Sequence, residues 1–236
     1  MNKLFFYIFF IMHVLCLKSQ DFKQDLTELV NQQNKLEKQC YRITYTLREN
    51  YNYNSRVIQK SVGKYIKLKN SYLSALDHIL SVNLPDEVIM IDSEQKKIVL
   101  SKNVKKTVAP SDQLKQIDEY NKYTSKTIVT QLSKNVVMYS VELKKNPYPI
   151  SKYELVIDTK SKSMVRLSLF YKGTLDKDDK YKVTGKEVPR MDIEFFDYNN
   201  FEKLKEIECT KGYYYIKTGN KLIPTDNYKG YEIKKY

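Results

Sequence analysis

The sequence predicts an α+β fold in which helices cover the concave face of one strongly curved antiparallel sheet. Three observations lead to this prediction. Residues 41–48 alternate apolar and polar side chains, as a half-buried antiparallel strand does. Two similar hairpins, Val88–Leu100 and Tyr153–Tyr171, supply further strands. An amphipathic stretch, Asp21–Gln39, predicts a helix whose apolar stripe needs a sheet to pack on.

The hairpin Tyr153–Tyr171 is the best defined element of the predicted sheet. Its apolar residues lie two apart and are expected to share one face, with Leu155 and Ile157 before the turn and Val165, Leu167 and Leu169 after it. Val88–Leu100 repeats this pattern, since Ile91-Asp92-Ser93 aligns with Ile157-Asp158-Thr159, and Lys96 aligns with Lys162. The repetition predicts that the sheet is assembled from similar hairpins.

The N-terminal helix and the strand that follows it have clear periodicities. The helical stripe is formed by Phe22, Leu26, Leu29, Val30 and Leu36. In the strand Tyr41–Arg48, the side chains expected on the buried face are Tyr41, Ile43, Tyr45 and Leu47. The next strand, Val57–Lys69, contains Gly63, where we expect a bulge or bend.

The remaining elements are predicted from shorter signals. Ser71–Leu84 is compatible with strand and loop or with a short helix, and Ser111 is expected to cap a helix that reaches about Tyr123. Further strands are expected at Val136–Leu143, Arg190–Tyr198, Gly212–Ile216 and Tyr228–Ile233. Lys172–Glu187 reads as an exposed loop, and Phe201–Ile207 as a short helix or loop. In Arg190–Tyr198, the side chains expected on one face are Met191, Ile193 and Phe195.

Residues 1–20 have the pattern of a secretory signal peptide. Lys3 precedes the apolar run Leu4–Leu17, and Lys18-Ser19-Gln20 ends it. The run is shorter than the roughly 20 residues of a membrane-spanning helix. Two alternatives remain open, a retained N-terminal anchor and lipid attachment at Cys16, although Leu15 stands where a lipoprotein signal has a small residue. We therefore expect export of a single domain, residues 21–236.

The charge of the chain argues for a solvated surface rather than a nucleic-acid partner. The formal net charge is +13, and loss of residues 1–20 would lower it to +11, because Lys3 and Lys18 are the charged residues removed. The lysines are scattered, and an exported protein does not meet nucleic acid. We expect no nucleic-acid partner, while transient contact with an anionic membrane surface or a membrane-bound partner fits the charge.

The sequence contains no constellation typical of an enzyme. His78 is the only histidine after residue 20, and its neighbour Asp77 does not complete a catalytic triad. Motifs for metal binding, phosphate cradling or a nucleophile elbow are missing from the chain. Cys40 and Cys209 either pair in an oxidising compartment or stay as two buried thiols. We expect a non-enzymatic protein without a cofactor.

The order of these elements resembles that of the LolA-like periplasmic lipoprotein carriers. The matching parts are the helix Asp21–Gln39 with the strand Tyr41–Arg48, the hairpin Val88–Leu100, and Tyr153–Tyr171 followed by Pro189–Tyr198. The chain departs from that family at Lys64–Leu84, which lacks its Lys-Arg-Pro and large aromatic residues, in having no tryptophan, and in a longer tail after Asn200. The resemblance implies an unclosed β-barrel with helices as a lid over an apolar cavity.

The same resemblance implies a soluble periplasmic carrier of lipoproteins, or of other acylated or hydrophobic ligands, held by their acyl chains. The side chains that would line such a cavity are Ile43, Tyr45, Leu47, Met90, Val141, Ile157 and Leu167. The alternative is a structural or accessory protein of the bacterial envelope that has the same fold but a filled cavity. A connected void would favour the carrier.

Overall fold

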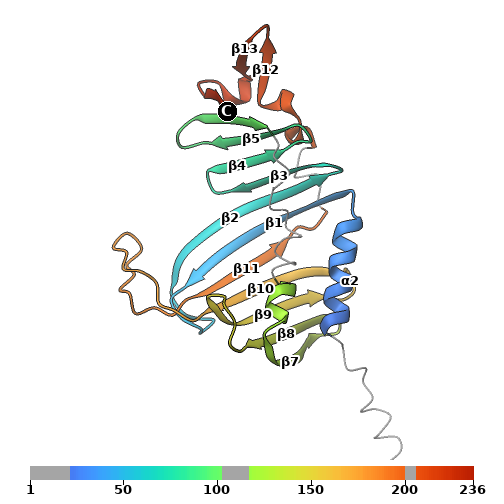
Figure 1. Ribbon diagram of the computed structural model, residues 1–236, viewed down its shortest axis with the longest axis vertical. Coiled ribbons are helices and arrows are strands. Elements are labelled where there is room, and N and C mark those ends of the chain that lie inside the picture. The colour runs from blue at the N-terminus through green and yellow to red at the C-terminus, as the bar shows by residue number, and fades with distance from the viewer. Residues whose placement is uncertain (1–21, 103–116, 200–205) are drawn as a thin grey trace, which may run out of the picture.

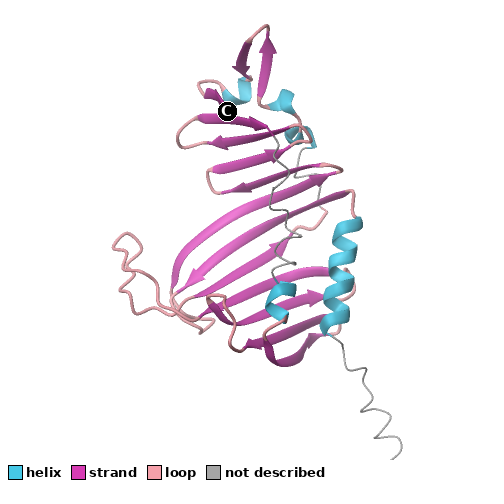
Figure 2. Cartoon of the chain, viewed as in Figure 1, coloured by secondary structure: helices cyan, strands magenta, loops and turns pink. Residues whose placement is uncertain are grey.

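The computed structural model describes residues 22–102, 117–199 and 206–236, and the predicted signal segment lies outside them. Most of the described chain is strand with few helices, and most strands join one large curved sheet that does not close on itself (Figures 1 and 2). The strands of this sheet are β1 (Lys38–Arg48), β2 (Val57–Leu68), β3 (Ser71–Leu76), β4 (Ile79–Asn83), β5 (Glu87–Asp92), β6 (Lys97–Lys102), β7 (Thr124–Ser133), β8 (Val136–Leu143), β9 (Ile150–Asp158), β10 (Ser163–Tyr171), β11 (Arg190–Phe196) and β14 (Glu232–Lys235).

Two antiparallel meanders make up this sheet, because strands that follow one another in the chain pair with one another. One meander is β1 to β6 and the other is β7 to β11, and they join where β1 pairs with β11, with Ile43 opposite Phe195. The C-terminal strand β14 adds to the edge strand β6 in parallel, with Ile233 opposite Ile98. A separate two-stranded sheet is formed by β12 (Tyr215–Thr218) and β13 (Lys221–Pro224).

The two similar hairpins turn in the same way, as their aligned residues predicted. The Oδ1 atom of Asp92 accepts hydrogen bonds from the backbone N–H groups of Glu94 and Gln95. The Oδ1 atom of Asp158 likewise accepts from the two N–H groups at the equivalent positions, in Lys160 and Ser161. Lys96 and Lys162 both adopt the left-handed conformation, with φ of 51° and 52°. The sequence repeat is therefore a repeat of one turn geometry.

A β-bulge changes which side chains of β10 are buried. The register of β9 and β10 shifts between Met164 and Arg166, so that Met164 pairs with Ile157. Met164 is buried, while Val165 is 37% exposed. The expectation that Val165 shares a face with Leu167 and Leu169 is therefore wrong, because the extra residue of the bulge breaks the alternation.

Both described α-helical segments pack on the same face of the sheet, which we call the helix face. The helix α2 (Phe22–Lys35) ends four residues before the predicted Gln39, which lies in β1. Figure 1 shows α2 lying over the strands β8 to β11. Leu26 and Leu29 of α2 are buried in one cluster with side chains of β1 and β8 to β11, and the ring centres of Phe22 and Tyr139 are 4.8 Å apart.

The second helical segment, residues 117–121, is the part of the predicted Ser111–Tyr123 helix that the structure describes. Ile117 is fully buried in the same cluster as α2, and the Tyr153 hydroxyl of β9 donates a hydrogen bond to Asn121.

The sheet has a buried core on each face, and the two cores meet at β1. Tyr41 belongs to the apolar cluster on the helix face, whereas its neighbour Cys40 belongs to a second cluster on the opposite face. From Cys40, directly paired and buried residues continue across five strands on that opposite face: Ile66, Leu73, Val82, Ile89 and Leu100. On the helix face of the same strands, Tyr65 of β2 is the last buried residue in the row. The residues paired in sequence with it across β3 to β6 are partly or fully exposed: Ser74, Ser81, Met90 and Val99.

The C-terminal segment covers the second core. It contains three short 3₁₀ helices, η2 (Glu206–Cys209), η3 (Lys211–Tyr213) and η4 (Asp226–Tyr228). Cys209 and Tyr214 are buried against β2 to β6, and several further aromatic and aliphatic side chains of this segment pack around them. Ion pairs between Lys64 and Glu208 and between Lys211 and Asp86 fix its position over the strands.

Two further local expectations are resolved by the strand pairing. Ser71–Leu84, for which the sequence was ambiguous, contains β3 and β4, joined at Asp77 with φ of 49°. Gly63 is neither a bulge nor a bend, because it pairs regularly with Ile43 and with Leu76. It is needed instead for close approach, since a Cβ atom there would lie 2.4 Å from the carbonyl oxygen of Ala75.

We expect Leu29→Asp to lower the free energy of unfolding by about 3 kcal/mol or more, because Leu29 is 1% exposed and a carboxylate there would have no partner. Urea denaturation measures the effect. Gln32→Asp, at an exposed position of α2, is the matched control and should change stability little. Equal stability of Leu29→Asp and the wild type would show that the α2 stripe is not buried.

Gly63→Ala is expected to lower the free energy of unfolding by about 1–3 kcal/mol, because its methyl group would overlap a backbone oxygen that cannot move independently. Thermal and urea unfolding would both report this loss. Gly173→Ala is the control, since a Cβ atom there meets no atom within 4 Å. If both variants unfolded at the wild-type midpoint, the close approach of β2 and β3 would be contradicted.

Candidate functional site

The helix face carries a row of half-buried apolar side chains beside its core. Leu47, Met191 and Leu169 lie directly opposite one another across β1, β11 and β10. All three are partly exposed, and Met191 and Leu169 pack against the buried cluster. Tyr45 and Tyr171, which are also half-buried, extend the row along β1 and β10. These five residues form what we call the apolar row.

The residues predicted to line a cavity fall into three groups in the structure. Ile43, Val141, Ile157 and Leu167 are 7%, 0%, 2% and 3% exposed, and form the floor of the helix-face core under protein side chains. Tyr45 and Leu47 belong to the apolar row. Met90 lies on β5 and is 46% exposed. The strands β4, β3 and β2 separate Met90 from β1, so it stands apart from the other six.

Met191, Leu169 and Tyr171 were not predicted from the sequence as ligand-contacting residues. The strands that carry them were predicted, and Met191 was expected on the same face as Ile193 and Phe195, as the structure confirms. What was missing is the β1–β11 pairing, which joins residues far apart in the chain and places Met191 beside Leu47. No local pattern in the sequence reports that register.

The opposite face of β1 and β9 to β11 holds a buried polar layer instead of an apolar core. Arg190 is fully buried, and its guanidinium donates a 2.8 Å hydrogen bond to Asp192. Asp192 also accepts a 3.1 Å bond from Nε of Arg48 and a 2.7 Å bond from the Ser168 hydroxyl. One carboxylate therefore links side chains of β1, β10 and β11 through charge-assisted hydrogen bonds.

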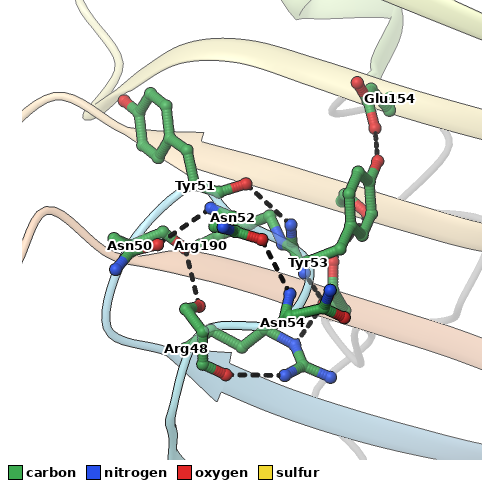
Figure 3. A network of polar contacts seen from close by, with 11 residues as sticks. Arg48, Asn50, Tyr51, Asn52, Tyr53, Asn54, Glu154 and Arg190 are labelled. Carbon is green, nitrogen blue, oxygen red and sulfur yellow. Dashed lines mark hydrogen bonds and ion pairs between the residues drawn. The ribbon is translucent and has the colours of Figure 1, made fainter.

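The loop between β1 and β2 closes over this polar layer (Figure 3). Arg190 donates a 2.8 Å hydrogen bond to the backbone carbonyl of Tyr51, and its guanidinium carbon lies 4.0 Å from the ring centre of Tyr53. The Tyr53 hydroxyl donates to Glu154, which is itself paired with Lys152 at 2.7 Å. Partial burial, followed by the hydrogen bond to Glu154, raises the pKa of Tyr53 to about 12, so this phenol stays a donor at neutral pH.

His, Cys, Asp and Glu side chains are the groups that could hold a metal ion. Within residues 22–102, 117–199 and 206–236, no group of three or more His, Cys, Asp or Glu residues is placed to hold a metal ion. His78 lies in the exposed β3–β4 turn, with its Nδ1 atom 3.6 Å from Glu94. In the same described ranges, no helix combines the length and the apolar character that crossing a bilayer requires.

Cys40 and Cys209 lie in one buried cluster, although 169 positions separate them in the chain. Both are thiols in the structure. Burial raises the pKa of the Cys40 thiol, which disfavours its reactive thiolate. The structure thus brings the two cysteines into the same core without joining them.

Comparisons with known proteins found no matching family model and no matching curated protein. Solved structures similar to this chain include members of the family that the sequence resembles. One is a LolA superfamily protein from Nitrosomonas europaea, with 4% identity, 75% of this chain and 91% of that chain covered, and a TM-score of 0.30. Another is a putative outer membrane lipoprotein-sorting protein domain from Vibrio parahaemolyticus, with 10% identity, coverage of 80% and 96%, and a TM-score of 0.29.

An uncharacterized conserved protein from Thermus thermophilus is also similar, with 11% identity, coverage of 75% and 86%, and a TM-score of 0.38. These similarities are too distant to transfer a ligand or an activity to this chain. The function is inferred below from the geometry of the helix face.

Asp192→Asn is expected to lower the free energy of unfolding by about 3 kcal/mol, because it leaves the fully buried Arg190 without its charge partner. Chemical denaturation at neutral pH measures this loss. The control is Asp179→Asn, whose side chain is 91% exposed and whose nearest cation, Lys177, is 3.7 Å away. A loss no larger than that of the control would contradict the structural role of the polar layer.

Proposed function

We propose that this protein binds the acyl chain of a lipoprotein, or another hydrophobic ligand, on its helix face and acts as a non-catalytic carrier in the periplasm. The observation that carries this proposal is the apolar row. Leu47, Met191 and Leu169 form a continuous apolar strip across three paired strands and remain partly open to solvent beside a buried core. A strip of this kind suits a ligand that is long, flexible and apolar.

The energy of such binding comes from apolar burial rather than from specific polar contacts. Each methylene removed from water contributes about 0.8 kcal/mol, so partial burial of an acyl chain is enough for reversible binding. Reversibility is what a carrier requires, because the ligand must also leave.

In this proposal the helix face is the concave side of the sheet, and α2 and residues 117–121 form its lid. Leu26 and Leu29 of α2 lie on the floor residues that the sequence predicted as cavity lining. A ligand that reached Ile157 or Leu167 would have to displace α2. We infer that the ligand first occupies the apolar row and deepens its contact as the helices shift.

A second candidate is an envelope accessory protein of the same fold that holds no ligand. It is favoured by one observation, the burial of Ile43, Val141, Ile157 and Leu167 under the protein's own side chains. In that case the helix-face core is permanently filled by protein side chains, and the apolar row is the partly exposed border of that core. Binding measurements separate the two candidates directly.

The carrier proposal predicts saturable binding of dansylated undecanoic acid, measured by fluorescence. The double variant Leu47→Gln with Met191→Gln should weaken binding at least about tenfold, because it removes apolar contact at nearly constant side-chain volume. Leu167→Trp would be a poorer test, because Leu167 is 3% exposed and a larger side chain there would strain the core.

Two single variants, one a control and one a further test, accompany this experiment. Val62→Gln alters a residue on the opposite face that is 43% exposed, and should leave binding unchanged. Met90→Gln decides whether the ligand surface reaches β5, as the sequence predicted. If the wild-type protein showed no saturable binding of this probe or of a purified lipoprotein, the carrier proposal would fail and the accessory function would replace it.

A further inference from the structure

The edge strand β7 differs from the other strands in how little of it is covered. All ten residues of β7 are exposed, and it is the last strand in the order of the large sheet. Ile128, Val129 and Leu132 are 43%, 46% and 50% exposed. In the described part of the chain, the outer edge of β7 has no paired strand. An exposed edge presents unpaired N–H and C=O groups that can accept another strand.

The opposite edge of the sheet is protected in the way edges usually are. There β6 is covered by β14, a strand of four residues that includes Lys234 and Lys235. Short length and lysine side chains discourage further pairing. The C-terminal segment is held at that end of the sheet, so it does not cover β7 (Figure 1).

We propose that β7 pairs antiparallel with β7 of a second copy of this chain, forming a dimer with a continuous sheet. The pairing of β7 with β8 is irregular at both ends, between Thr124 and Lys126 and between Gln131 and Ser133. The regular stretch between them, Lys126–Gln131, is the docking strand. It is rich in β-branched residues, contains no proline, and has Lys126 as its single charge.

Symmetry limits the registers that this dimer can adopt. In antiparallel strands, residues that lie opposite one another have their side chains on the same face of the sheet. A two-fold axis perpendicular to the sheet must therefore pass between one residue and the same residue of the second copy. Axes at Ile128 and at Val129 both avoid lysine facing lysine within β7, because Lys126 lies opposite Thr130 in the first register and opposite Leu132 in the second. We take the axis at Val129, whose other pairs are Val129 with Val129, Ile128 with Thr130, and Thr127 with Gln131.

Self-pairing fits this edge because charge does not oppose it at any position of the Val129 register. The same axis places the helix faces of both copies on one side of the joined sheet. The apolar row lies on β1, β10 and β11, away from β7, so dimer formation neither needs nor blocks the proposed ligand site.

The test is the association state of protein purified from cells that express the full chain. Sedimentation across a concentration series should show a dimer that dissociates on dilution. Val129→Lys places two cations opposite each other and should weaken self-association at least about tenfold. Val62→Lys is the matched control, since Val62 is 43% exposed on the interior strand β2, and it should associate like the wild type.

Cross-linking gives a second measurement that does not depend on the lysine variant. Residues directly opposite in antiparallel strands have Cα atoms about 4.5–5.5 Å apart, within reach of a disulfide. Val129→Cys should therefore give a covalent dimer on mild oxidation, whereas Val62→Cys should not. A wild type that stays monomeric at its highest soluble concentration, or undiminished association of Val129→Lys, would overturn the proposal, and probe binding would be unaffected in either case.

Discussion

Strand β1 is covered on both faces, and this double burial determines how the rest of the sheet is arranged. Cys40 points into the core under the C-terminal segment, and Tyr41 points into the core under α2. A slip of one residue in the register of β1 would exchange the two sets of side chains. Aromatic contacts fix that register, because the Tyr41 ring stacks on Tyr65 at 5.1 Å and meets Phe195 edge-on at 5.5 Å. Both meanders are therefore anchored to one strand.

The two cores are covered differently, and that difference separates stability from binding. The core of β2 to β6 lies under the chain's own C-terminal segment, where Tyr214 is fully buried and its hydroxyl donates to the Glu208 carbonyl. The core of β1 and β8 to β11 lies under short helical segments and continues into half-buried residues. The half-buried apolar residues beside the helix-face core are the ones that an exchangeable ligand could reach, since covering them does not require the sheet to rearrange.

Most of the fold followed from local pattern, and the failures have physical causes. The alternation of Tyr41–Arg48 and the turn aspartates Asp92 and Asp158 identified their strands, because one face is buried and each turn is closed by its own side chain. Strand β7 was missed because a strand exposed on both faces needs no alternation of apolar and polar residues. The change of core face at β1 and the neighbours of Leu47 depend on pairing between distant segments, which hydropathy does not encode.

The polar layer behind the helix-face core is unsuited to an apolar ligand, which is why we propose binding on the other face. An acyl chain entering beside Arg190 would separate this guanidinium from its partners without replacing the hydrogen bonds. The free energy lost by leaving a buried charge unpaired exceeds the free energy gained from the apolar contact. The loop that carries Tyr51 and Tyr53 ties β1, β9, β10 and β11 together on this face. A sheet held firmly on its polar face can expose, cover or exchange apolar contacts on its helix face without losing the strand register on which both cores depend.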